Sequence, residues 1–216
     1  MENKKILNAA LIGGGMFGSD VVLRSIEDIE RCGIAPYLGR IGLDERARDL
    51  GAVSLKLVAI GTRTAETAGT LCASYSEKIP GAAPAPFHGE TPWIDIFEKH
   101  DVNILYVATP DHLHHAPTLH ALEQGAHVMV EKPLTLHLEQ ADELISLARE
   151  KGLVAGVDMH KRYDPCHRFI FEELAGQLGK LLYARAVLEE PLEVATEIFR
   201  WAEDSNPFSY VGIHWL

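Results

Sequence analysis

Strand-length apolar runs alternate with segments of helical periodicity through the first 160 residues of this 216-residue chain. The first run, from Leu7 to Ile12, precedes a segment from Phe17 to Ile29 whose apolar residues fall on one helical face. The segment from Cys32 to Ser54 interrupts this order and is predicted to be an insertion, partly helical from Asp44 to Leu50. Further strands are predicted over residues 55–60, 104–108, 127–130 and 154–157, and further helices over 64–75, 93–97, 116–123 and 138–149. Repeated alternation predicts a parallel sheet with helices on both faces.

The pattern changes after residue 157, and we expect two regions. Residues 1–157 carry the regular alternation, and residues 158–216 carry a predicted helix from Pro165 to Leu178, a predicted strand from Leu181 to Leu188 and an irregular end. The predicted fold class is α/β, a doubly wound parallel sheet followed by a partial α+β domain.

Charge and hydropathy exclude several classes of partner. The chain has 20 basic and 31 acidic residues and a formal charge of −11, so it repels phosphate backbones and we expect no nucleic-acid partner. No apolar stretch approaches 18 residues, and the N-terminus lacks the pattern of a secretory signal, so we expect no membrane partner. Cys32, Cys72 and Cys166 are odd in number and far apart, which favours a reducing, cytoplasmic location.

A glycine-rich turn follows the first predicted strand and opens the first predicted helix. Gly13, Gly15 and Gly18, with Met16 and Phe17 between them, form the pattern G-x-G-x-x-G. The first glycine permits a tight turn, the second lets the backbone approach a diphosphate, and the third allows close packing of helix and strand. The free N–H groups and the positive dipole end of the helix then favour a bound phosphate. This context predicts a dinucleotide-binding site.

The end of the second strand favours NADP over NAD. In dinucleotide-binding folds an acidic residue at this position holds the ribose 2′-hydroxyl. Here the strand ends in Thr62 and Arg63, and a guanidinium pairs with a 2′-phosphate that a carboxylate would repel. An alternative register gives the acidic role to Asp44, which follows a poor strand and would favour NAD.

Two further motifs follow the fourth and fifth strands. They are Ala108-Thr109-Pro110-Asp111-His112-Leu113-His114 and Glu131-Lys132-Pro133. Together with the glycine turn they resemble the Gfo/Idh/MocA oxidoreductase family, and the resemblance runs from Leu7 to His214. It implies a Rossmann domain over 1–157, the start of a substrate and oligomerisation domain over 158–216, and a homo-oligomer. The implied reaction is hydride transfer between NADP(H), or NAD(H), and a sugar or polyol.

The resemblance also assigns roles to individual residues. Lys132 would lie near both the nicotinamide and the substrate and act as proton donor or acceptor for the substrate oxygen. A lysine at the carboxyl end of a parallel strand points into the crevice where cofactors bind. Glu131 would orient Lys132 or contact the nicotinamide ribose. The remaining cofactor contacts would come from the loop after the fourth strand, at Thr109, Pro110, His112 and His114.

Five metal-ligating residue types lie close together in the same loop and the helix after it: Asp111, His112, His114, His115 and His120. Zinc needs ligands that converge from one face, and no cysteine or second cluster lies at a suitable spacing. We therefore predict no metal site.

Substrate contacts are expected from the second region. The resemblance implies that the segment from Asp158 to Pro165, which enters the second region, faces the substrate. His160 and Arg162 are the candidates there, and His214 matches a family histidine. The family commonly has Asp four residues before this histidine, and here that position is Tyr210. On a helix Tyr210 and His214 share a face, so a proton could pass between them. We assign both to the catalytic group with Lys132.

Two other functions are compatible with these motifs. One is a glycosidase of the same fold family that uses tightly bound nicotinamide for transient oxidation. The other is a non-catalytic nucleotide-binding or regulatory module, because the chain ends two residues after His214 whereas family members continue and complete a second sheet.

Overall fold

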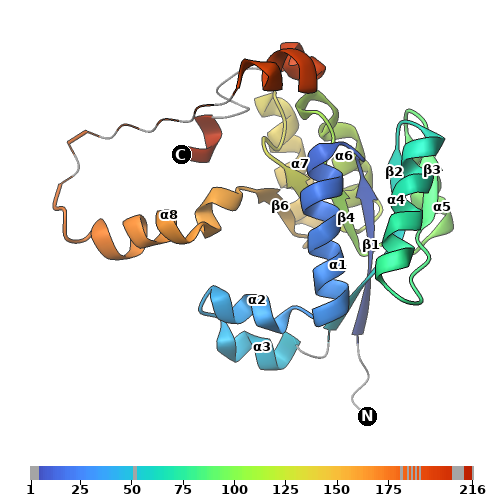
Figure 1. Cartoon of the computed structure of the whole chain (residues 1–216), viewed down its shortest axis with the longest axis horizontal. Helices are drawn as coiled ribbons and strands as arrows, with labels where there is room; N and C mark the ends of the chain where they lie inside the picture. Colours follow the sequence, from blue (N-terminus) through green and yellow to red (C-terminus); the bar gives the residue numbers. More distant parts are fainter. Residues whose placement is uncertain are drawn as a thin grey trace.

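The protein is built around one parallel sheet, seen in a computed structural model that describes residues 5–50, 53–180, 182–183, 185, 187, 189, 191–205 and 212–215 (Figure 1). The strands are Lys5–Ile12 (β1), Val53–Thr62 (β2), Ala85–His88 (β3), Ile104–Val107 (β4), His127–Glu131 (β5) and Ala155–Asp158 (β6). Their order in the sheet is β3-β2-β1-β4-β5-β6, and all neighbours are parallel. This order is that of the Rossmann fold, and it reverses between β1 and β4, where ligands bind beyond the carboxyl ends of the strands. The predicted doubly wound sheet is confirmed.

β1 lies at the centre of the sheet because its side chains alternate between two apolar layers. Ala9 and Leu11 belong to one buried cluster, and Ala10 and Ile12 belong to the other. The first layer packs against η1 (Gly18–Val22), α1 (Leu23–Cys32) and α4 (Ala65–Lys78), and the second against α5 (Pro92–Lys99), α6 (His115–Glu123) and α7 (Leu138–Lys151). No helix in the described part of the chain has the length and apolar character needed to cross a bilayer.

β3 is a strand that the apolar pattern did not reveal. It has only four residues and includes Pro86, which cannot donate to a ladder. β3 lies at the edge of the sheet, where such a residue is tolerated, and only Phe87 is buried in the core.

The insertion between α1 and β2 contains the helix predicted over Asp44–Leu50 and a second helix that was not predicted. α2 (Ala35–Arg40) and α3 (Asp44–Leu50) pack against each other. They lie beside the start of β2, at the amino edge of the sheet and away from the carboxyl ends of the strands (Figure 1).

The chain after β6 contains short helical segments. They are η3 (His160–Tyr163), α8 (Pro165–Phe169), η4 (Ile170–Leu174), η5 (Val194–Ile198), η6 (Arg200–Asp204) and η7 (Gly212–Trp215). The helix expected over 165–178 therefore exists as far as residue 174 and contains a π turn. The strand expected over 181–188 is wrong for the residues of that range that are described, 182–183, 185 and 187, which have no regular structure. A strand needs a neighbour to accept its hydrogen bonds, and Leu182 and Tyr183 instead face solvent.

We expect Gly13→Ala to destabilise the protein by about 3 kcal/mol, because the left-handed backbone strain adds to a steric clash. Gly13 has φ +112°, and a Cβ there would lie 2.1 Å from the carbonyl oxygen of Ala108. Gly69→Ala in α4 is the matched control, since no described atom lies within 4 Å of its built Cβ. It should stabilise the chain by up to about 1 kcal/mol through helix propensity. Urea unfolding measures both, and equal effects would contradict this account.

Candidate functional site

The glycine-rich turn lies at the carboxyl edge of the sheet, where β1 ends and the first helix begins. Gly13 approaches Ala108 directly after β4, and a Cβ on Gly18 would lie 2.6 Å from the carbonyl oxygen of Gly13. At Gly15 no described atom lies within 4 Å of a built Cβ, so the backbone is open to a ligand. Two glycines therefore close the turn and one leaves room, which is the cradle that a diphosphate requires.

Gly14 has a role that the sequence pattern did not reveal. A Cβ at Gly14 would lie 2.8 Å from the Cγ2 atoms of both Thr62 and Thr67. The turn is thus pressed against the end of β2 and the start of α4.

The predicted helix from Phe17 to Ile29 is present, but it contains the π turn η1 before α1. Met16 is exposed at its start. The Phe17 ring lies 6.2 Å from the ring of His160, centroid to centroid. One predicted cofactor residue and one predicted substrate residue are thereby brought side by side.

Thr62 and Arg63 lie beside the glycine turn because β2 pairs with β1. Thr62 is buried, and its hydroxyl donates to the carbonyl oxygen of Thr64 at 2.8 Å. Arg63 is exposed beyond the strand, and its guanidinium forms no hydrogen bond or ion pair with any residue that the structure describes. The alternative register is wrong, because Asp44 begins α3 at the opposite edge of the sheet.

His114 holds two loops of the site together. It is fully buried, with Nδ1 2.6 Å from the carbonyl oxygen of Pro133 and Nε2 2.8 Å from that of Thr109. Burial lowers the pKa of His114, while the two carbonyl acceptors act in the opposite direction. Each ring nitrogen lies within hydrogen-bonding distance of a carbonyl oxygen, so His114 holds the two loops in place, and its expected contact with the cofactor stays a prediction.

The other residues of this loop differ in accessibility. The Thr109 hydroxyl is buried and has no hydrogen-bond partner among the described residues, so it can serve a ligand. Pro110 is partly buried beside it, and His112 is exposed. Asp111 is buried and accepts a hydrogen bond from the hydroxyl of Ser205, which ties the C-terminal region to the loop.

Two acidic side chains meet beside Lys132. Glu131 ends β5 and pairs in register with Asp158 at the end of β6, and their carboxyl groups are hydrogen-bonded. Burial, then the Asp158 carboxyl, raise the pKa of Glu131 to about 9, while Lys132 acts to lower it. Glu131 and Lys132 are each 9% exposed, and a cis peptide bond joins Lys132 to Pro133. Asp158 was missed from sequence, although its place at a strand end beside Glu131 is a usable signal.

The predicted substrate residues lie in the segments after β6. Arg162 is exposed in η3, and no described residue pairs with its guanidinium. His214 belongs to η7, which packs against η3. Tyr210 lies outside the described residues, so the predicted Tyr210–His214 pair stays a prediction.

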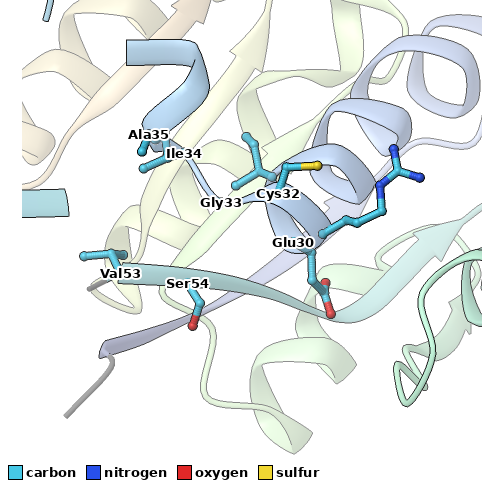
Figure 2. Close-up of a pocket in the computed structure, with 9 residues that line it drawn as sticks. Glu30, Cys32, Gly33, Ile34, Ala35, Val53 and Ser54 are labelled. Atoms are coloured by element: carbon cyan, nitrogen blue, oxygen red, sulfur yellow. The ribbon is translucent and has the colours of Figure 1, made fainter. Parts of the chain in front are cut away.

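Within the described residues, no three side chains of the metal-ligating types converge on one point. A groove of about 210 Å³ lies at the far edge of the sheet, between the end of α1 and the start of β2 (Figure 2). Glu30 lines it, and its Oε2 atom already accepts hydrogen bonds from Tyr75 Oη at 2.5 Å and from the Leu57 N–H at 3.0 Å. This groove is remote from the carboxyl edge that carries the site.

Residues 7–159 match a family described as "Oxidoreductase family, NAD-binding Rossmann fold" (GFO_IDH_MocA). A 1,5-anhydro-D-fructose reductase of Ensifer adhaerens is 42% identical over 86 residues, 39% of this chain and 26% of that protein. A dTDP-3,4-didehydro-2,6-dideoxy-alpha-D-glucose 3-reductase of Actinomadura kijaniata is 37% identical over 87 residues, 40% of this chain and 26% of that protein.

Solved structures give the same fold. KijD10, a 3-ketoreductase from Actinomadura kijaniata in complex with NADP, superposes with a TM-score of 0.57 at 24% identity, covering 80% of this chain and 44% of that one. UDP-N-acetylglucosamine 3-dehydrogenase GnnA from Acidithiobacillus ferrooxidans superposes with a TM-score of 0.55 at 21% identity, covering 77% and 41%. The chain thus spans less than half of the length of these two proteins.

The buried acid predicts a pH-dependent stability. The folded pKa of Glu131, about 9, lies above its ordinary value of 4.5, so the folded state binds more protons and stability falls as pH rises through that window. Glu131→Gln removes this pH-dependent contribution to the free energy of unfolding. We expect its melting temperature, relative to the wild type, to rise by on the order of 5 °C between pH 5.5 and 8.5. Glu150→Gln, at an exposed position of α7, is the control, and a pH-independent difference for Glu131→Gln would contradict the assignment.

Proposed function

This chain belongs to the GFO_IDH_MocA family of oxidoreductases with an NAD-binding Rossmann fold, and from that membership we propose that it serves hydride transfer between NADP(H) and a sugar or polyol. The observation that carries the proposal is the convergence of the open glycine turn, the buried Thr109 hydroxyl and Lys132 at one edge of the sheet. The reductases of Ensifer adhaerens and Actinomadura kijaniata named above support a carbohydrate as the class of substrate.

The nicotinamide dinucleotide would be held at the carboxyl edge of the sheet. Its diphosphate would lie at Gly13, Gly15 and Gly18, and its adenosine ribose beside Thr62 and Arg63. When bound, the nicotinamide supplies or accepts the hydride. Arg63 supports NADP, because its exposed guanidinium can pair with a 2′-phosphate and no carboxylate ends β2.

Lys132 would move the proton that accompanies hydride transfer. Lys132 follows the carboxyl end of β5, beside the crevice. Its ammonium group can give a proton to a developing alkoxide or stabilise the alkoxide. His160, Arg162 and His214 would contact the substrate from the segments after β6, where residues 158–216 begin the substrate domain. The activity belongs to the whole protein, whose partners would be a small carbohydrate and further copies of itself.

Lys132→Ala tests the chemical role. We expect turnover to fall by about 10²–10⁴-fold, since a positioned acid–base group contributes that factor, while nucleotide affinity changes little. Absorbance of NADPH with a panel of aldoses, inositols and keto-sugars measures the first, and calorimetry measures the second. Nucleotide binding without turnover of any substrate by the wild type would instead support the regulatory module.

Arg63→Ala tests the choice of cofactor. We expect the affinity for NADPH to fall by about 10–100-fold, because a charge-assisted hydrogen bond is lost, with little change for NADH. Arg149→Ala, at an exposed position near the end of α7, is the matched control for the loss of one positive charge. An equal loss for both nucleotides at Arg63→Ala would show that the 2′-phosphate is not its ligand.

A further inference from the structure

The ends of β5 and β6 bring two carboxyl groups together beside Lys132. Glu131 and Asp158 are register partners on adjacent parallel strands, so the backbone ladder itself fixes their side chains at one level. Two carboxylates can only accept hydrogen bonds, and the bond between these groups therefore needs one proton. Two adjacent carboxyl groups cannot both be ionised at low cost.

Burial identifies Glu131 as the group that carries the proton. Glu131 is 9% exposed, and its Oε1 atom is buried without a donor from the described residues. An ionised Glu131 would leave that oxygen unsatisfied, whereas Asp158 is only partly buried. The raised pKa of Glu131, about 9, agrees with this geometry.

We propose that Asp158 is a positioning residue: it accepts the proton of Glu131 in a hydrogen bond, so that at neutral pH the negative charge of the pair lies on Asp158 and not on the residue next to Lys132. This inference rests on the proposed role of Lys132. A carboxylate at Glu131 would hold the proton of the Lys132 ammonium more tightly, and a neutral acid there makes that proton easier to transfer.

The charged and titratable groups around Glu131 influence one another. Lys132, which directly follows β5, lowers the pKa of Glu131 and also that of His114, which faces Asp111 in the loop after β4. Asp158 acts from β6. A change at Asp158 is therefore expected to reach Lys132 through Glu131.

Carbon-13 NMR of glutamate, aspartate and lysine side chains in the whole chain tests the proposal without substrate or cofactor. The signals of Glu131 and Lys132 are assigned by their loss in Glu131→Gln and Lys132→Arg. In the wild type we expect Glu131 to stay protonated at pH 7. In Asp158→Asn, where the amide cannot take the charge, we expect its titration to move down by about two pH units and that of Lys132 to move up by about one. Glu150→Gln should move neither.

Three results would overturn the proposal. The first is a wild-type Glu131 that titrates in the ordinary carboxyl range. The others are an Asp158→Asn variant in which the titration of Glu131 does not shift, and one in which the titration of Lys132 does not shift. Should Asp158→Asn not fold, the titration of Asp158 itself decides: in Glu131→Gln it must become a single simple step, and unchanged behaviour refutes the pairing. Failure to bind either pyridine nucleotide in calorimetry would refute the proposed function and leave these titrations unaffected.

Discussion

The close contact of two backbone segments at the carboxyl ends of β1 and β4 determines where the other parts of the site lie. Gly13 sits so close to the carbonyl group of Ala108 that no side chain fits between the ends of β1 and β4. These two strands are the ones between which the winding of the sheet reverses. The reversal opens a crevice at their carboxyl ends, and the missing Cβ atoms leave backbone N–H groups to form its floor.

The parallel arrangement of the strands then brings the polar side chains of the site to one edge of the sheet. Because all six strands point the same way, the last residues of β2, β5 and β6 arrive at the same edge as the glycine turn. Thr62, Glu131 and Asp158 are each the final residue of a strand. Glu131 is the more buried of the last two, so the low dielectric of the sheet edge penalises its charged form, and one proton between the two carboxyl groups removes the repulsion of two anions.

Much of the fold was accessible from sequence because it depends on local signals. Hydrophobic periodicity identified β1, β4 and α7, and the glycine spacing identified the turn, since both arise from residues near one another in the chain. β3 was not predicted, because four residues that include a proline show no hydrophobic periodicity. The roles of Gly14 and His114 escaped because their partners, Thr67 and Pro133, are distant in sequence.

The same reasoning explains why the region after β6 resisted prediction. A helix such as α8 satisfies its own hydrogen bonds, and Asp164 caps its start by accepting hydrogen bonds from the N–H groups of Cys166 and His167. A strand takes its partners from elsewhere in the protein, so alternation over 181–188 states a preference that only a neighbouring strand can realise. β6 leads directly into this region, and the shared proton at its end links the regular sheet to the segments that carry the expected substrate contacts.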